Sequence, residues 1–265
     1  MIDYKGLCEH TCRIARKASD FIKGELENIK QENIETKGKN DFVTYVDKGS
    51  EEIIVQGLKD LLPSAGFITE EETIVKKGEQ FNWIIDPLDG TTNFLHGLPP
   101  YSISIALMEN KHCVLGVIHE VTLNETFYAW KDSKAYLNEK EIKVSNMKKL
   151  ENSLIATGFP YYNFDRLESF MDSLEFFMNY YHGVRRLGSA AADLAYVACG
   201  RFESFYEYNL KPYDVAAGAF IVERAGGKVT DFKGGDDYLF GKEIVAANDL
   251  VFDEFLQAIQ KYMIN

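Results

Sequence analysis

Hydrophobic positions along the 265-residue chain follow two different spacings. Apolar residues recur every three or four positions over Tyr4–Ile22, a spacing typical of an amphipathic helix. The same spacing predicts a second helix over about Asp47–Leu62, and Pro63 stands just beyond its end. The intervening segment Gln31–Asn40 is polar, and we predict a loop there.

Short apolar runs rich in β-branched and aromatic residues predict strands. In the first half these lie at Gly66–Thr69, Trp83–Asp86, Ser102–Met108, Cys113–His119 and Thr126–Trp130, and Asn138-Glu139 is predicted to turn a hairpin. In the second half we predict strands at Leu154–Thr157, Glu203–Tyr206, Gly227–Thr230 and Ile244–Ala247, and helices at Leu167–Tyr180, Ser189–Gly200, Asp214–Ala225 and from Leu250 onward. Strands interleaved with helices indicate a layered fold of the α/β (α+β) type.

Charge and hydropathy narrow the classes of partner. The 41 acidic and 29 basic residues leave a formal net charge of −12. A general nucleic-acid binder carries a basic face, so we expect no nucleic acid as a partner. No apolar run is long enough to span a bilayer, so we expect no membrane partner either.

The four cysteines and the polar amino terminus bear on the compartment. Cys8, Cys12, Cys113 and Cys199 lack the paired spacing of a zinc site and are predicted to be thiols in a reducing compartment. The first residues contain no apolar segment of the kind found in signal peptides. These features predict a cytoplasmic protein.

The most informative segment is Trp83-Ile-Ile-Asp-Pro-Leu-Asp-Gly-Thr-Thr-Asn-Phe94. Pro87 has no N–H to donate, so we predict that the strand ends there and presents Asp86 and Asp89 at its carboxyl end. Gly90 then begins a short helix whose first N–H groups attract anions. Carboxylates and N–H groups are compatible side by side if divalent cations lie between the carboxylates and a phosphate. The alternative is a simple turn, in which Asp caps a helix and Gly adopts a positive φ.

This segment resembles the Asp-Pro-(Ile/Leu)-Asp-Gly-Thr signature of the inositol monophosphatase family, within the magnesium-dependent, lithium-sensitive sugar phosphatases. Further segments resemble the family in the same order: Lys37–Asp47, Phe67–Glu71, Gly188–Ala198, Phe205–Glu207, Lys211–Gly218 and Ala225–Gly227. The resemblance implies a layered α-β-α-β-α sandwich and a homodimer. It also implies an N-terminal α/β half, residues 1–150, with most metal ligands, and a C-terminal half, residues 151–265, with substrate-binding residues.

The resemblance also implies a set of magnesium ligands. Glu70, Asp86 and the backbone carbonyl of Leu88 would hold one cation, and a weakly held third would rest on Glu70 through waters. Asp86 would bridge to a second cation, which Asp89 and Asp214 complete. Among the three successive glutamates at 70–72 we assign Glu70, because the apolar residues 67–69 before it match the family pattern.

Catalytic and substrate-binding roles follow from the same resemblance. The Thr91 hydroxyl, hydrogen-bonded to Asp47, would orient the attacking water, and Glu70 belongs to the catalytic set through its cation. The implied substrate-binding residues are Gly90 and Thr91, whose N–H groups would cradle the phosphate, together with Asp89, Ala190, Glu207 and Asp214. Glu207 and Asp214 would accept hydrogen bonds from polyol hydroxyls.

The sequence therefore predicts a Mg²⁺-dependent phosphomonoesterase that hydrolyses myo-inositol 1-phosphate by attack of a metal-activated water. An acidic residue at position 207 disfavours a second phosphate by repulsion. The alternatives are the same chemistry on histidinol phosphate, fructose 1,6-bisphosphate or a 3′-phosphonucleotide, and a catalytically idle binding or regulatory protein.

Tyr213 departs from the tryptophan usual in the family before the metal-binding Asp, which affects pocket shape. Arg185 and Arg186 are predicted to form surface or interface ion pairs.

Overall fold

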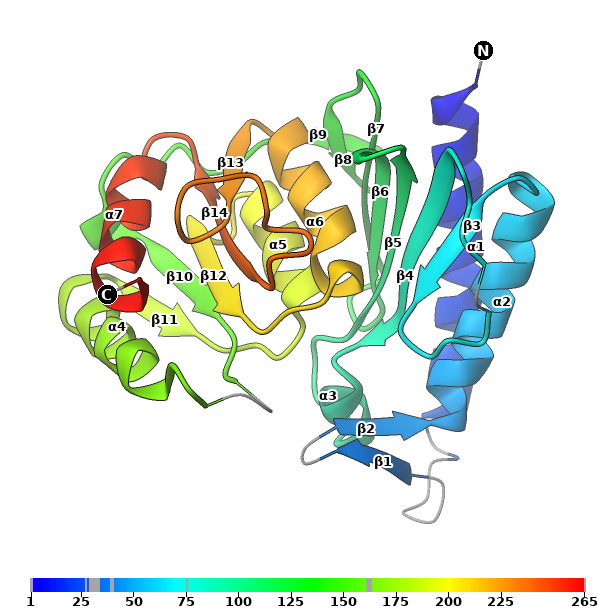
Figure 1. The fold of residues 1–265 in the computed structure, drawn as a ribbon, viewed down its shortest axis with the longest axis horizontal. Coiled ribbons are helices and arrows are strands. Elements are labelled where there is room, and N and C mark those ends of the chain that lie inside the picture. The colour runs from blue at the N-terminus through cyan, green and yellow to red at the C-terminus, as the bar shows by residue number, and fades with distance from the viewer. Residues whose placement is uncertain are drawn as a thin grey trace.

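The chain folds into five alternating layers of helices and sheets (Figure 1). The computed structural model describes residues 2–26, 28, 34–38, 41–74, 76–160 and 164–264, with the backbone alone for 34–38 and 41–44. Two large sheets run through the molecule, one of seven strands and one of five, and strands β1 (Ile34–Gly38) and β2 (Asp41–Thr44) form a separate two-stranded sheet. Helices cover the outer face of each sheet, and a helix pair lies between them. The layered α-β-α-β-α architecture predicted from the sequence is confirmed.

The seven-stranded sheet belongs to the first half of the chain. Its strands follow sequence order: β3 (Gly66–Thr69), β4 (Phe81–Asp89), β5 (Ser102–Glu109), β6 (His112–Glu120), β7 (Glu125–Trp130), β8 (Ala135–Leu137) and β9 (Lys140–Ile142). The β3–β4 pair is parallel and all the other pairs are antiparallel. Helices α1 (Tyr4–Glu25) and α2 (Tyr45–Leu61) pack on its outer face, where Ile22, Ile54 and Trp83 belong to one buried cluster.

The five-stranded sheet belongs to the second half. Its strands lie in the order β11 (Gly183–Arg185), β10 (Leu154–Thr157), β12 (Ser204–Tyr208), β14 (Glu243–Asn248) and β13 (Gly227–Thr230). A short 3-10 helix, η2 (Leu150–Asn152), precedes β10, so the proposed division at residue 150 falls between the two sheets. Helices α4 (Leu167–Tyr180) and α7 (Phe252–Met263) cover the outer face, with Phe177 and Phe255 in the buried cluster beneath them.

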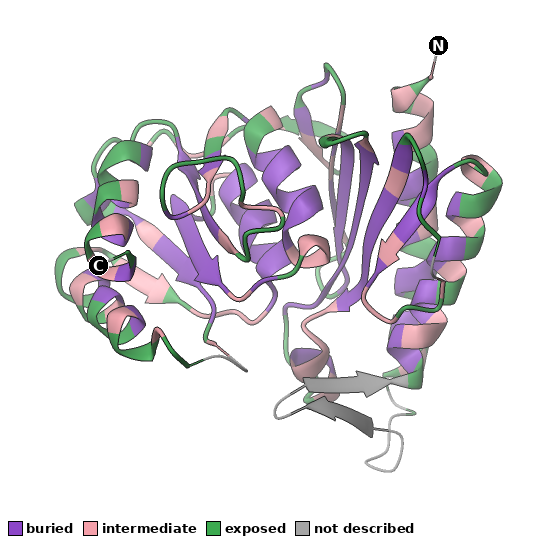
Figure 2. Cartoon of the chain, viewed as in Figure 1, coloured by how far each residue is buried: buried purple, intermediate pink, exposed green. Residues whose placement is uncertain are grey.

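Helices α5 (Ala190–Ala198) and α6 (Pro212–Arg224) form the middle layer and are almost wholly buried (Figure 2). All nine residues of α5 are buried, and five of them are alanine. Small side chains let a helix approach both sheets closely, and the central cluster joins Ile84 of the first sheet to Phe205 of the second. This shared core places the amino-terminal ends of α5 and α6 beside the carboxyl end of β4.

The prediction of a loop over Gln31–Asn40 is wrong in part. Residues Ile34–Gly38 form strand β1, which pairs antiparallel with β2 (Asp41–Thr44); positions 31–33 and 39–40 lie outside the described residues. A two-stranded ladder is held by backbone N–H and C=O groups, which polar residues supply as well as apolar ones. Hydropathy therefore does not reveal it.

The predicted hairpin turn and the predicted thiol state of the cysteines are confirmed. Asn138 and Glu139 have positive φ values of 45° and 71° and connect β8 to β9, as a type I′ hairpin turn requires. All four cysteines are thiols; Cys8 and Cys12 are buried, and Cys113 and Cys199 are half-buried. Within the described ranges, no helix is long and apolar enough to cross a membrane.

Candidate active site

A bulge in β4 directs Asp86 and Asp89 to the same side of the sheet. The prediction that the strand ends at Pro87 is wrong, because β4 continues to Asp89. Asp86 pairs with Ser104 and Asp89 with Ser102, so β4 contains one residue more than its partner between these pairs. Residues three apart in a regular strand point to opposite faces, and the extra residue cancels that alternation. Pro87 lies in the bulge, where a missing N–H is tolerated.

Gly90 makes the turn from β4 into the short helix α3 (Thr91–Leu95). Its φ is +96°, a conformation that other residues rarely adopt. A Cβ at this position would also lie 3.1 Å from the Pro100 carbonyl oxygen and 3.2 Å from that of Gly188. Glycine is therefore required here by both backbone conformation and space.

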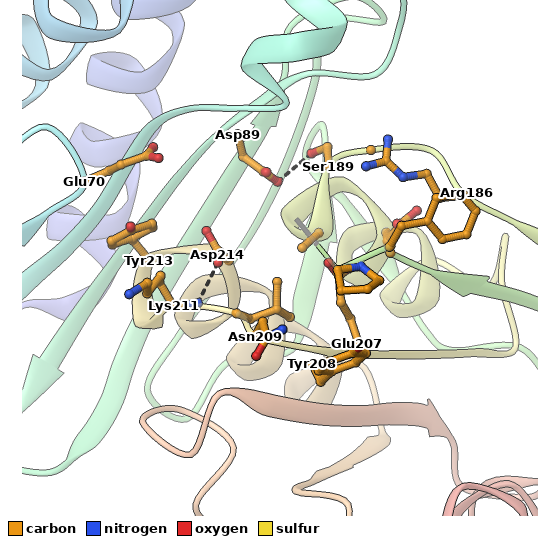
Figure 3. Close-up of a pocket in the computed structure, with 17 residues that line it drawn as sticks. Glu70, Asp89, Arg186, Ser189, Glu207, Tyr208, Asn209, Lys211, Tyr213 and Asp214 are labelled. Atoms are coloured by element: carbon orange, nitrogen blue, oxygen red, sulfur yellow. Dashed lines mark hydrogen bonds between the residues drawn. The ribbon is translucent and has the colours of Figure 1, made fainter. Parts of the chain in front are cut away.

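Four carboxylates from two elements and one loop converge at this end of the sheet. Glu70 follows β3, Asp86 and Asp89 lie on β4, and Asp214 lies in the first turn of α6. Asp86 is close enough to share hydrogen bonds with both Glu70 and Asp214. Glu70, Asp89 and Asp214 line a cavity of about 190 Å³ and face it from different sides (Figure 3). Asp86 is therefore central to the cluster.

Burial and mutual repulsion raise the pKa values of these carboxyl groups. Burial, and then the charges of Glu70, Asp89 and Asp214, hold the pKa of Asp86 well above its usual range. Burial raises the pKa of Asp89 to about 6, although hydrogen bonds from Ser189 and Ala191 act in the opposite direction. Burial and the Asp89 charge raise the pKa of Asp214 to about 7. The raised pKa values show that these buried carboxylates repel one another without enough positive charge nearby to balance them.

These oxygen donors fit Mg²⁺, a hard cation that prefers carboxylates, carbonyls and water. Among the described residues, no three acidic, histidine or cysteine side chains are already assembled as a complete metal site. Mg²⁺ does not need such a cage, because one or two carboxylates suffice when waters and substrate phosphate oxygens complete its octahedron. Glu70, Asp86, the Leu88 carbonyl, Asp89 and Asp214 are the residues here that could hold it.

A pH-dependent effect of Mg²⁺ on stability follows from the raised pKa values. In the metal-free protein, Asp89 and Asp214 keep a proton up to about pH 6–7, whereas in the unfolded chain they lose it near pH 4. The folded state therefore loses stability as the pH rises from about 4, where the unfolded chain loses these protons, to about 6–7, where the folded protein loses them. A cation replaces those protons, so we expect the Tm gain from saturating Mg²⁺ to be larger at pH 8 than at pH 5. Thermal unfolding with and without Mg²⁺ measures it, and equal gains at both pH values would contradict the charge argument.

Thr91 and Asp47 lie beside the carboxylate cluster. The Thr91 hydroxyl is 3.0 Å from Oδ1 of Asp47 and 3.1 Å from the carbonyl oxygen of Leu88, and it can donate to either. Asp47 is buried in the first turn of α2. The contact places a hydroxyl next to the carbonyl that the family resemblance assigns to the first cation.

Hydrogen bonds across the two halves of the chain fix the geometry of the site. Oδ2 of Asp89 accepts from the Ser189 hydroxyl at 2.6 Å and from the Ala191 N–H at 2.7 Å, at the start of α5. Nδ2 of Asn93 donates to the carbonyls of Pro100 and Leu187 at 2.8 and 2.7 Å. Both halves are needed to hold Asp89 in place.

Glu207 and Ala190 line the same cavity. Glu207, on β12, is buried, and burial followed by the charges of Asp214 and Asp89 raises its pKa well above the usual range. Gly158 makes room for it, because a Cβ there would lie 2.1 Å from the Glu207 carboxyl group. Tyr213 also lines the cavity, at the position where the family usually has tryptophan.

Two lining residues were not predicted to belong to the site. Arg186 was assigned to surface or interface ion pairs, but it lines the cavity and its charge acts on Asp89, Asp193 and Glu207. Asp193 on α5 is 1% exposed, and no hydrogen bond to its Oδ1 is found among the described residues. Asp193 is the one charged residue in an alanine-rich helix, and this could have indicated from the sequence that it belongs to the site. Nothing in the local sequence shows which way Arg186 points.

Comparison with known proteins agrees with the fold. The model of the inositol monophosphatase family matches residues 3–263. Nus factor SuhB of Vibrio cholerae is 41% identical over 250 residues, covering 94% of each chain, and inositol-1-monophosphatase of Mesorhizobium japonicum is 39% identical over 239 residues, covering 90% of this chain and 89% of that one. The solved structure of Thermotoga maritima IMPase is 36% identical, covers 96% of both chains and superposes with a TM-score of 0.88.

Fold and site together define a layered α/β protein with a carboxylate cluster between its two halves. The chain belongs to the inositol monophosphatase family. Family membership supports a phosphatase. It does not by itself identify the substrate, because relatives of similar identity carry different names.

Proposed function

We propose that this chain is a Mg²⁺-dependent phosphomonoesterase that hydrolyses myo-inositol 1-phosphate to inositol and phosphate. The observation that supports it best is the shared cavity, which Glu70, Asp89 and Asp214 line together with Glu207. A phosphate held near Glu70, Asp89 and Asp214 would place the hydroxyls of its alcohol near Glu207. We also propose a cytoplasmic homodimer, on the strength of the family likeness.

Charge neutralisation and proton acceptance are the main tasks of the site. Mg²⁺ held by Glu70, Asp86, the Leu88 carbonyl, Asp89 and Asp214 would lower the pKa of a bound water and neutralise phosphate charge. Oγ1 of Thr91, while donating to Asp47, has lone pairs that can accept a hydrogen bond from the attacking water. The Gly90 and Thr91 N–H groups would bind phosphate oxygens.

The polar groups at the other end of the cavity suit a neutral polyol. The carboxylates of Glu207 and Asp193 would accept hydrogen bonds from hydroxyl groups, and Arg186 would partly balance their charge. A second phosphate would meet two acidic groups and one basic group there. We therefore favour a monophosphate over fructose 1,6-bisphosphate.

Phosphate release from a panel of phosphomonoesters tests this proposal. We expect Mg²⁺-dependent turnover, with the highest kcat/KM for inositol 1-phosphate over histidinol phosphate, fructose 1,6-bisphosphate, a 3′-phosphonucleotide and glycerol 2-phosphate. A higher kcat/KM for histidinol phosphate would change the substrate but keep the chemistry. No turnover of any ester with Mg²⁺ would reject the proposal.

Glu207→Gln should reduce kcat/KM for inositol 1-phosphate by about 5–30-fold. The change turns a charge-assisted hydrogen bond into a neutral one, a loss on the order of 1–2 kcal/mol. Glycerol 2-phosphate lacks ring hydroxyls, so its kcat/KM should fall less. The ratio of kcat/KM for the two substrates is the measurement, since errors in active-enzyme concentration cancel.

A second variant reaches the same carboxyl group indirectly. Gly158→Ala would place a methyl group where the Glu207 carboxyl lies, so it should shift the substrate ratio in the same direction. Glu203→Gln is not a suitable control, because Glu203 accepts the Leu154 N–H within the sheet. The exposed Glu168 on α4 is suitable, and Glu168→Gln should leave the ratio unchanged. Equal losses on both substrates in Glu207→Gln would mean that Glu207 serves the fold or the metals.

A second candidate function comes from the relatives named Nus factor SuhB, which match 94% of this chain at 41% identity in the case of V. cholerae. That name points to a transcription-associated role. A net charge of −12 favours contact with a protein of the transcription machinery over direct nucleic-acid binding. Binding to a purified transcription complex, repeated with the Asp86→Asn variant, would show whether such a role exists and whether it needs the metal site.

A further inference from the structure

Three residues on one face of α2 contact three different segments of the site. Asp47, Ser50 and Glu51 are buried and lie three and four positions apart, which places them side by side on a helix. Asp47 accepts from Thr91 at 3.0 Å, and the Ser50 hydroxyl donates to the Pro87 carbonyl at 2.9 Å. Glu51 contacts the loop that follows β3.

Glu51 accepts three hydrogen bonds from that loop. Its Oε2 accepts the Glu71 N–H at 2.8 Å, and its Oε1 accepts the Thr73 N–H at 2.8 Å and the Thr73 hydroxyl at 2.6 Å. The side chain is 0% exposed. A carboxylate buried without such donors would be strongly unfavourable, so these bonds hold both Glu51 and the loop.

The loop that Glu51 holds carries Glu70. The Glu70 N–H donates to the Ile85 carbonyl of β4 at 3.2 Å, and the next N–H, that of Glu71, donates to Glu51. The backbone on either side of the Glu70 side chain is therefore bonded to β4 and to α2. These contacts hold the backbone from which the Glu70 side chain extends.

We propose that Glu51 is a positioning residue that holds Glu70 in place for the divalent cation. The inference rests on the proposed function, in which Glu70 is a metal ligand. Groups that orient a metal ligand without touching the metal change metal affinity by about 10–100-fold when they are removed. Loss of Glu51 should therefore weaken Mg²⁺ binding more than it slows turnover at saturating Mg²⁺.

The test compares Glu51→Gln with Glu52→Gln. Glu52 is the exposed neighbour on the same helix, so the control changes the charge by the same amount. A glutamine at 51 would set its NH₂ group against one of the loop N–H donors. We expect Glu51→Gln to bind Mg²⁺ about 10–100-fold more weakly by calorimetry, and to regain near-wild-type kcat at high Mg²⁺. Glu52→Gln should match the wild type.

Trypsin digestion gives a readout that does not depend on activity. The exposed Lys76 and Lys77 lie at the far end of the same loop, so its release from α2 should speed cleavage there. Thr73→Val is a milder variant, because it removes only the hydroxyl bond to Glu51 from an exposed residue. Thr73→Val should weaken Mg²⁺ binding about 3-fold, because only one of the three hydrogen bonds to Glu51 is lost. This variant also tests the proposal if Glu51→Gln does not fold.

The outcomes separate this inference from the proposed function. If the wild type binds no Mg²⁺, the proposed function fails. If the wild type binds Mg²⁺ but Glu51→Gln and Thr73→Val bind it as Glu52→Gln does, the positioning role of Glu51 is wrong. Weaker binding in Glu51→Gln with unchanged cleavage at Lys76 and Lys77 would also overturn it, because the effect would not pass through the loop.

Discussion

Asp86→Asn and Asp89→Asn are each expected to reduce Mg²⁺-dependent phosphate release by ~10³-fold or more, the scale of losing several kcal/mol of charge stabilisation. Asp86 interacts with Glu70, Asp89 and Asp214, so asparagine there removes a charge from the centre of the cluster. At Asp89, an NH₂ group in the Oδ2 position would face the N–H of Ala191. If these residues hold the cation as proposed, both changes would weaken the cation site and displace the attacking water.

Phosphate release at saturating Mg²⁺ and a Mg²⁺ titration of each variant measure this loss. Asp20→Asn is a matched control, because Asp20 is exposed on α1 and is not one of the residues that line the cavity. Far-ultraviolet circular dichroism and Tm would show that the variants are folded. Near-wild-type turnover in both Asp86→Asn and Asp89→Asn would reject the metal assignment.

Thr91→Ala is expected to lower kcat by ~10²–10⁴-fold, the usual scale of assistance by a positioned proton acceptor. Its hydroxyl lies within 3.1 Å of both Asp47 and the Leu88 carbonyl, and alanine cannot replace either contact. Asp47 would then lack the group that connects it to the attacking water. The fold should change little, because Thr91 is only partly buried in a five-residue helix.

Steady-state kinetics at saturating Mg²⁺ separates two roles for Thr91. Thr92→Ala is the matched control on the same helix and should retain most of the wild-type kcat. A fall in kcat with unchanged KM would support the orientation of water. If KM alone rises, Thr91 binds phosphate and the proposed orientation is wrong.

Local chemistry was enough to predict most elements and the central motif. Helix α1 and most strands of both sheets follow from apolar spacing, since a helix or strand forms where its own side chains repeat at the matching period. The short strand β11 was not predicted. The Asp-Pro-Leu-Asp-Gly-Thr segment is likewise local, and with the family resemblance it indicated the pairing of Thr91 with Asp47.

Tertiary packing decided the features that depend on distant partners. The extra residue in β4 is defined only against Ser102 and Ser104 of β5, so Pro87 alone could not show that the strand continues. Arg186 points into the cavity because Asp89, Asp193 and Glu207 meet there from three different elements. The sequence by itself determined most of the elements and supplied the carboxylates that we propose hold the cation. Only the tertiary structure determined which side chains share the cavity, because that depends on contacts between residues far apart in the chain.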